Sequence, residues 1–222
     1  RQLGKINIDL LRPSDIIFLD GFSHAVLKSY SKRMFDIAAS SVILALASPL
    51  ILIAAVVVYL ESGGRDPIFY RQERVGRNGR IFEVIKFRSM RVDAEKHGVQ
   101  WAKKNDPRVT AVGGFLRKTR IDELPQLFNV FRGDMSFVGP RPERPQFVED
   151  LNAQIPYFAM RHRVNPGITG WAQISYPYGA SLRDAKEKLQ YDLYYIKNYS
   201  LFLDLTIIFQ TFQVVLWGQG AR

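Results

Sequence analysis

The longest apolar stretch of the chain is Ile37 to Leu60, in which 24 consecutive residues carry no charge. A helix of this length can cross a hydrocarbon core of roughly 30 Å. Ser48 and Pro49 divide the stretch into two arms of 11 residues each, and a proline inside a helix removes a backbone hydrogen bond and bends the axis. Each arm reaches only about 16 Å, which is about half of the core.

This pattern supports three interpretations: a straight transmembrane anchor, a bent helix that enters and leaves the same leaflet, and a buried helix of a soluble core. Basic residues stand on both sides of the stretch, and the positive-inside rule then places both ends in the cytoplasm. We therefore predict a re-entrant membrane helix over residues 31–62, broken at Ser48 and Pro49, with the Ser48 hydroxyl bonding a freed carbonyl. The flanking basic residues are Lys28, Lys32, Arg33, Arg65, Arg71, Arg74 and Arg77.

Two short apolar segments beyond this helix, Pro67–Tyr70 and Ile81–Phe87, are typical of strands, and the turn residues of Val75–Gly79 lie between them. Lys86 and Arg88 are two residues apart and are expected to share a face that points into a phosphate site. The alternative is a basic hairpin that rests on anionic lipid headgroups.

The remaining pattern is mainly helical, so the predicted fold class is α+β with amphipathic helices at a membrane surface. A capping box at Ser181 opens a helix that should run to about Lys197, and Leu201–Trp217 is predicted to lie on the membrane or to close the core. Other expectations are a strand or short helix at Asp15–Leu19, a helix over Arg91–Asn105, a turn at Gly113-Gly114, helices over Arg144–Ala153 and Ile155–Val164, and a strand over Ala172–Ser175.

The candidate chemistry gathers between Arg117 and Arg144, where an adjacent pair of carboxylates, Asp122 and Glu123, stands among basic residues. An apolar helix should follow this acid pair and stop at Gly133. Taken singly, Asp122 is an ordinary helix cap and the segment Gly139-Pro-Arg-Pro142 a rigid turn. Together, acids beside guanidinium groups suit a metal-bound phosphate, because carboxylates hold the cation and arginines hold phosphate oxygens.

The composition limits the kinds of partner and of metal ion that the chain is expected to bind. Lys and Arg number 31 against 21 Asp and Glu, a net charge of +10, which indicates an anionic partner such as nucleic acid, an anionic membrane face or a phosphorylated substrate. The chain has no cysteine, and its three histidines are far apart in sequence, so no zinc-type spacing exists. A hard cation such as Mg²⁺, held by Asp122, is therefore expected.

Four blocks between Lys86 and Gln173 resemble the bacterial sugar transferase family, the monotopic polyprenyl-phosphate phosphoglycosyl transferases. The resemblance runs from about Ser31 to the C-terminus, and residues 1–30 resemble the linker that joins an upstream region in long members. The four blocks are Lys86-Phe-Arg-Ser-Met90, Asp122-Glu-Leu-Pro-Gln126, Gly133-Asp-Met-Ser-Phe-Val-Gly-Pro-Arg-Pro142 and Pro166-Gly-Ile-Thr-Gly-Trp-Ala-Gln173.

The resemblance implies a catalytic domain over residues 63–222 on the cytoplasmic face of the bacterial inner membrane. That domain would transfer sugar-1-phosphate from a UDP-sugar to undecaprenyl phosphate with release of UMP. By motif position, Asp122 matches the nucleophile and Glu123 its partner acid, while Arg117 and Arg141 match phosphate-binding positions. A helix N-terminus and a metal are expected to keep Asp122 ionised. The resemblance gives a less definite role to three further residues in its recurring blocks, which are Lys86, Arg88 and Asp192.

Two rival functions remain open from the residues alone. One is a membrane-anchored nucleic-acid binder, although the basic residues interleave with acids and no recognition module is visible. The other is a non-catalytic scaffold in which the carboxylates only cap helices. We favour the enzyme and expect no nucleic-acid partner; the sugar, the pathway and a homo-oligomeric state are left open.

Overall fold

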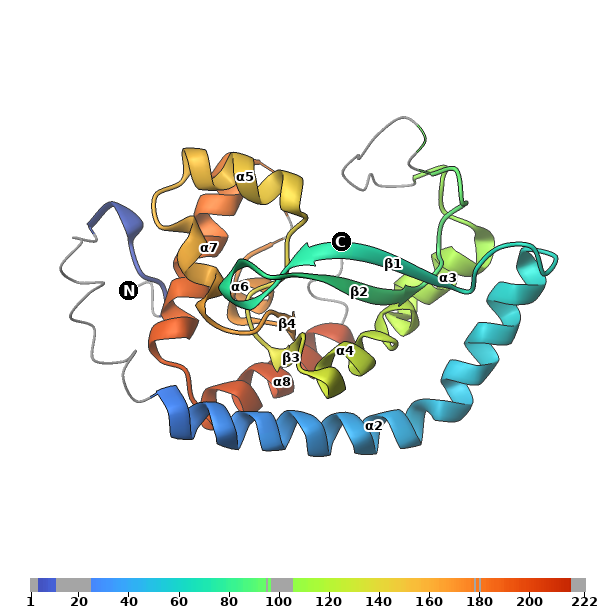
Figure 1. Ribbon diagram of the computed structural model, residues 1–222, viewed down its shortest axis with the longest axis horizontal. Coiled ribbons are helices and arrows are strands. Elements are labelled where there is room, and N and C mark those ends of the chain that lie inside the picture. Colours follow the sequence, from blue (N-terminus) through green and yellow to red (C-terminus); the bar gives the residue numbers. More distant parts are fainter. Residues whose placement is uncertain are drawn as a thin grey trace.

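A computed structural model of the protein describes residues 4–10, 25–94, 96, 106–177, 179 and 181–216. These residues form a mostly helical fold with two small sheets, in agreement with the α+β class (Figure 1). The predicted segment Asp15–Leu19 and most of Arg91–Asn105 lie outside the described residues. The α-helices are α2 (Ala25–Glu61), α3 (Ala111–Thr119), α4 (Gln126–Arg132), α5 (Pro145–Gln154), α6 (Trp171–Ser175), α7 (Leu182–Lys197) and α8 (Leu201–Leu216).

The longest helix, α2, is continuous from Ala25 to Glu61 and bends where the sequence predicted a break. Pro49 lies inside it, and the hydroxyl of Ser48 donates a 2.8 Å hydrogen bond to the carbonyl of Ala45. In a regular helix that carbonyl would accept from the amide of residue 49, which proline lacks. Figure 1 shows that α2 runs along one side of the molecule and then turns sharply, with a long arm of the helix continuing beyond the bend. The Ser48 hydroxyl therefore satisfies the carbonyl that the bend leaves free, as predicted.

The apolar part of α2 is not a soluble core helix. Among the described residues, one helix is long and apolar enough to cross a membrane, Tyr30–Glu61, and only 11% of its apolar window is buried. Leu46, Leu52 and Leu60 are each more than 60% exposed. Burial of apolar surface is the main gain of a core helix, so this exposure argues against the third interpretation of the stretch.

The first half of α2 is fastened to the rest of the fold by charged side chains. Lys32 Nζ lies 2.5 Å from Asp204 Oδ2 of α8, and both groups are buried. Arg33 donates to the carbonyls of Val130 and Phe131 at the end of α4, each at 2.6 Å. These contacts hold the apolar helix in a fixed position beside α4 and α8.

The predicted hairpin is present. Strands β1 (Phe69–Val75) and β2 (Ile81–Phe87) pair antiparallel with Tyr70 opposite Lys86, and η3 (Arg77–Gly79) forms the turn. The first strand begins and ends later than Pro67–Tyr70. Asn129 of α4 fixes the hairpin, because its side chain accepts from the Ile85 amide at 3.1 Å and donates to the Glu83 carbonyl at 2.7 Å.

The second sheet joins two of the sequence blocks. Strands β3 (Ser136–Val138) and β4 (Gly167–Thr169) pair in parallel. Immediately beyond β3, the Gly139 amide donates to the Thr169 carbonyl at 2.9 Å. A Cβ atom on Gly139 would lie 2.3 Å from the Asn165 carbonyl oxygen, and one on Gly167 would lie 2.1 Å from the Gly139 nitrogen. Both positions therefore need glycine for this close approach of two backbones.

Two local predictions were wrong, and one predicted helix is shorter than expected. Gly113 and Gly114 lie inside α3, not in a turn: a Cβ on Gly113 would lie 2.1 Å from the Ser89 carbonyl oxygen, so contact with Ser89 explains that glycine. Residues Ala172–Ser175 belong to helix α6, where the Gln173 amide bonds the Gly170 carbonyl at 2.9 Å. The helix expected over Ile155–Val164 is present over Phe158–Arg163, as the 3₁₀ helix η5.

The last two helices and the N-terminal segment complete the core. The capping box at Ser181 is present and α7 ends at Lys197, as predicted. In α8, Ile207 is buried and Phe209 is 65% exposed, so one face closes the core and the other remains apolar and exposed. The segment that contains η1 (Ile8–Leu10) packs on α7, with Ile8 buried in a cluster that includes Val148, Leu189 and Leu193.

Candidate active site

The acid pair lies on a short 3₁₀ helix, η4 (Ile121–Glu123), between α3 and α4. Arg120 joins α3 to η4 with a left-handed backbone (φ 61°), a conformation that is strained for a residue with a side chain. This turn directs Asp122 and Glu123 toward the end of β2. The acids therefore precede α4 by one tight turn, and they do not sit on its first residues as the sequence suggested. As predicted, α4 ends at Gly133, whose φ is 96°.

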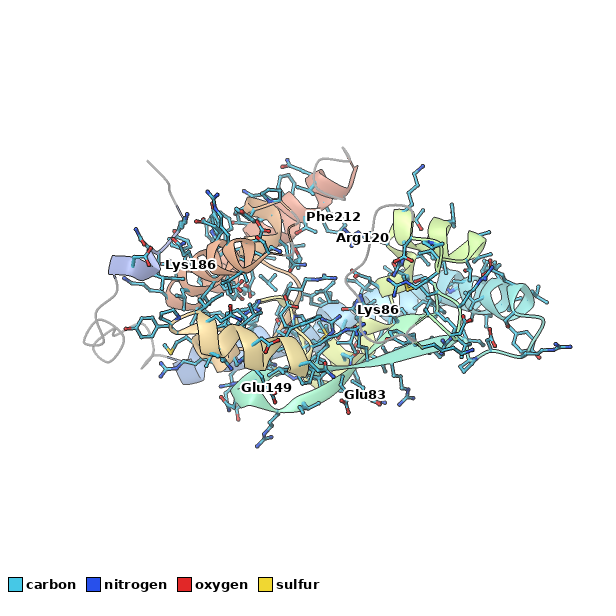
Figure 2. All side chains as sticks on the ribbon, turned by 90° about the horizontal axis from the view of Figure 1, so that it is seen from above. Glu83, Lys86, Arg120, Glu149, Lys186 and Phe212 are labelled. Carbon is cyan, nitrogen blue, oxygen red and sulfur yellow. The ribbon has the colours of Figure 1, made fainter. Side chains whose placement is uncertain are left out.

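Glu123 is the centre of a cationic cluster. Its Oε1 lies 2.9 Å from Lys86 Nζ, 3.5 Å from Arg141 Nη2 and 3.9 Å from Arg120 Nη1. Figure 2 shows Lys86 and Arg120 in the same region of the molecule, while Glu83 of the same strand as Lys86 points outward. Side chains from three of the four sequence blocks thus lie in this cationic cluster or next to it.

Asp122 differs from its neighbour because its carboxylate lacks such partners. The residue is 7% exposed, and its Oδ1 is buried without a hydrogen-bond partner among the described residues. A buried carboxylate oxygen without a partner is costly. Such an oxygen is explained where a bound cation or a substrate group supplies the partner that the chain does not.

The environment separates the pKa values of the two acids. Burial raises the pKa of Asp122, and the neighbouring charge of Glu123 raises it further, with partial opposition from Lys86. Burial alone would also raise the pKa of Glu123, but Lys86 and Arg141 outweigh it and hold that pKa well below its usual range. The protein groups around Asp122 thus act against the expected ionisation, because burial has the largest effect on its pKa; the part of the expectation that concerns a metal stays a prediction. Two adjacent acids with opposite shifts are typical of a catalytic pair with divided roles.

The other predicted residues occupy different positions around this pair. Arg117 lies in the last turn of α3, where its Nε donates to Ser89 Oγ at 3.0 Å, and its charge acts on Asp122. Arg88 donates to the Pro67 carbonyl at 2.8 Å and lies over the Tyr70 ring. The described contacts of Arg88 are thus with the start of the hairpin and not with the acid pair, and its role in substrate binding stays a prediction.

Asp192 lies apart from the acid pair. It is 2% exposed, and its Oδ2 lies 2.9 Å from Arg161 Nη2 in a contact without hydrogen-bond geometry. Burial raises the pKa of Asp192 to about 6, although the Arg161 charge opposes this. Sequence reasoning did not identify Arg161, Asn129 or Ser89. Ser89 lies within the block Lys86–Met90, and Asn129 is a polar residue between apolar neighbours in α4, so the sequence offered a signal for these two and none for Arg161.

A hard divalent cation fits the groups present. No cluster of three or more His, Asp or Glu side chains that would make a complete metal site occurs in the part of the chain that the structure describes. Mg²⁺, however, commonly takes one or two carboxylates and completes its shell with water and substrate phosphates. The buried, unpartnered Oδ1 of Asp122 is an oxygen of the required kind.

Comparison with known proteins agrees with the sequence blocks. A family model described as bacterial sugar transferase matches residues 27–218. The chain belongs to this family. The match covers α2, the hairpin, the acid pair and the two C-terminal helices, so the whole candidate site lies within it.

Three relatives illustrate the range of sugars in this bacterial sugar transferase family. A UDP-N-acetylgalactosamine-undecaprenyl-phosphate N-acetylgalactosaminephosphotransferase of Aeromonas hydrophila is 46% identical over 99% of the chain and 51% of its own length. A UDP-glucose:undecaprenyl-phosphate glucose-1-phosphate transferase of Klebsiella pneumoniae is 48% identical over 81% of the chain and 39% of its own length. An undecaprenyl-phosphate galactose phosphotransferase of Salmonella typhimurium is 41% identical over 86% of the chain and 42% of its own length. The chain spans about half the length of these relatives, or less.

Proposed function

We propose that this chain transfers sugar-1-phosphate from a UDP-sugar to undecaprenyl phosphate and releases UMP, as the first membrane step in the synthesis of an exopolysaccharide or another glycoconjugate. The observation that carries the proposal is the split acid pair: Asp122 keeps an unpartnered oxygen, while Glu123 is held among Lys86, Arg120 and Arg141. Family membership adds support, because the named relatives act on undecaprenyl phosphate.

The chemistry proceeds in two displacements at one phosphorus atom. An oxygen of Asp122 attacks the β-phosphorus of the UDP-sugar, an Asp–O–P bond forms, and the bond to the UMP oxygen breaks so that UMP leaves with its electron pair. A phosphate oxygen of the lipid then attacks the same phosphorus. This second attack forms the lipid diphosphate-sugar and restores the Asp122 carboxylate. Splitting the transfer lets UMP leave before the second anion arrives, which avoids crowding of like charges.

The residues around the acid pair have different roles in this reaction. A carboxylate with a lowered pKa is a poor proton acceptor, so Glu123 serves to hold Lys86 and Arg141 in place more than to remove a proton. Arg117 and Arg141 stabilise charge on the oxygens of the transferring phosphoryl group. When Mg²⁺ is bound through Asp122, it neutralises phosphate charge and favours the ionised form of that acid.

The exposed apolar surface fits a site at the depth of lipid headgroups. Helices α4 and α8 both contact α2, and each exposes aromatic rings: Phe128 and Phe131 on α4, and Phe202, Phe209 and Phe212 on α8. Amphipathic helices of this kind lie in a membrane interface. The re-entrant course of α2 and the cytoplasmic face of the bacterial inner membrane belong to the same proposal.

The test is to trap the covalent intermediate. Enzyme is mixed with Mg²⁺ and a panel of UDP-sugars without lipid, quenched rapidly and analysed by mass spectrometry. We expect a gain of one sugar phosphate on the peptide that contains Asp122, together with about one UMP per active site. Adding undecaprenyl phosphate should then remove the adduct and start turnover.

The matched variants are Asp122→Asn and Asp150→Asn. Asp150 is exposed on α5, so its variant should behave as the wild type, whereas Asp122→Asn should give neither adduct nor UMP while still binding membranes. Near-normal turnover by Asp122→Asn, or UMP release only in the presence of lipid, would instead indicate direct attack by the lipid phosphate.

A further inference from the structure

The backbone that carries Arg141 is held at three consecutive carbonyl groups. The Arg141 carbonyl accepts from Arg161 Nη2, the Pro142 carbonyl from Arg74 Nη1 and the Glu143 carbonyl from the Val75 amide, each at 2.9 Å. Pro140 and Pro142 already restrict the local chain. The position from which the Arg141 side chain reaches Glu123 is therefore set by partners outside its own segment.

Arg161 is the residue that donates a hydrogen bond to the carbonyl of Arg141 itself. It lies on η5 and its side chain is 7% exposed. Its guanidinium group lies over the Phe158 ring, 5.0 Å from the centroid, and its Nη1 is 3.9 Å from Glu143 Oε1. A planar guanidinium between a ring and two acids has little freedom to rotate.

Asp192 contacts the same guanidinium group. The same nitrogen, Nη2, that donates to the Arg141 carbonyl lies 2.9 Å from Asp192 Oδ2. Asp192 stands in the middle of α7, and its helix neighbours Leu189, Leu193 and Ile196 are buried. The carboxylate thus occupies a rigid position and decides where Nη2 lies.

Stability alone is a weak explanation for this ion pair. A buried pair often stabilises a fold no more than apolar residues of similar volume would, because both charges lose their hydration. The geometry between Oδ2 and Nη2 is also not that of a good hydrogen bond. Unlike an apolar pair, this ion pair provides a hydrogen-bond donor to the Arg141 carbonyl.

We propose that Asp192 and Arg161 are positioning residues for the transfer reaction, which act by fixing Arg141 beside the acid pair. This inference rests on the proposed function, because it assigns Arg141 to the transferring phosphate. It predicts that loss of either residue lowers the rate of transfer mainly through Arg141.

The kinetic test is a double-mutant cycle that combines Asp192→Asn with Arg141→Lys. Asp192→Asn alone should lower kcat roughly 10- to 100-fold, the scale of a small misplacement of a catalytic group. In the Arg141→Lys background the same change should cost less than about 3-fold, because the arginine that it positions is gone. Equal losses in both backgrounds, or a wild-type kcat in Asp192→Asn, would overturn the inference.

The control for a purely structural effect is Glu187→Gln. Glu187 lies on the same helix and pairs with Lys5 at 2.5 Å, without a link to Arg141 among its described contacts. The Glu187→Gln variant should have slightly lower thermal stability and an unchanged kcat. If Asp192→Asn does not fold, Arg161→Lys takes its place in the cycle, since it keeps the charge but loses the fork that reaches the Arg141 carbonyl.

A second measurement is independent of turnover. Amide hydrogen exchange in the peptide that contains residues 137–147 should be faster in Asp192→Asn than in Glu187→Gln, because the Arg141 segment has lost one of its three anchors. Equal exchange in the two variants would contradict the positioning role. Absence of turnover in the wild type with every UDP-sugar would contradict the proposed function instead, and hydrogen exchange would then decide the inference alone.

Discussion

The hydroxyl of Ser48 bonds the carbonyl of Ala45 at 2.8 Å, at the one helical position where Pro49 offers no amide. The bend of α2 is thereby stabilised within the helix itself. An apolar helix that bends and satisfies its own backbone is able to turn back inside one leaflet.

The first prediction concerns topology. Single cysteines at Ser31 and Ser62 are clean probes, because the chain has no cysteine. An impermeant maleimide applied to whole cells should label neither position if both ends of α2 face the cytoplasm. Replacing Pro49 with Leu should favour a straight, spanning helix and make one of the two positions reactive from outside. Strong labelling of either cysteine with Pro49 intact would rule out the re-entrant course.

The second prediction concerns the metal. Turnover should stop after dialysis against EDTA and return with Mg²⁺, because Asp122 is buried beside a second acid and two phosphates must enter the same site. Zn²⁺ should restore little activity, since the chain has no cysteine and the described residues contain no cluster of metal ligands. Turnover that is unchanged in EDTA would remove the metal from the mechanism.

The third prediction concerns Arg141. Arg141→Lys should lower kcat/KM roughly 10- to 100-fold, because a point charge does not reproduce a planar fork that reaches both Glu123 and a phosphate. Arg132→Lys is the matched control, since Arg132 is exposed at the end of α4. Steady-state kinetics of UMP release would measure both variants, and equal kcat/KM values for the two would contradict the assignment.

The fourth prediction concerns stability at acidic pH. Burial and the adjacent Arg161 charge lower the pKa of His162 to about 4. Between this value and the ordinary histidine pKa of about 6.5 the unfolded chain binds a proton that the folded chain does not, so stability falls as the pH falls. Because the ring is partly exposed, we expect a loss of only about 1–2 kcal/mol over this window.

His162→Gln should remove that dependence. The raised pKa of Asp192 acts in the opposite direction, because its folded form holds the proton more tightly. The measurement is therefore the difference between variant and wild type in thermal denaturation at pH 7.5 and pH 5. A difference that does not change with pH would show that His162 titrates normally in the folded chain.

Local signals in the sequence were sufficient for several parts of the fold. The hydrogen bond of Ser48 beside Pro49, the stop at Gly133 and the capping box at Ser181 each depend on a few neighbouring residues, and each is present. The composition around Asp122 and Glu123 also located the candidate site. These features follow from backbone chemistry that acts over one or two turns.

Contacts between distant residues explain what the sequence did not show. Gly113 was taken for a turn because its close approach to Ser89 is not visible in the sequence. The expected ionisation of Asp122 relied on a helix end and a metal, whereas the burial that raises its pKa comes from packing that the sequence does not show. Likewise, nothing near Arg161 in the sequence indicates that it bonds the carbonyl of Arg141.

The N-terminal segment has a practical consequence for work with protein fragments. The family match begins at residue 27, but Ile8 is 3% exposed in a cluster with Leu189 and Leu193, and the Ile6 amide bonds the Gln190 carbonyl. A recombinant piece trimmed to the family boundary would uncover the apolar side chains of Leu189 and Leu193 on α7, on either side of Asp192 along the chain. Such a piece should aggregate more readily and turn over more slowly than the 222-residue chain, although every residue of the acid pair and its cations would still be present.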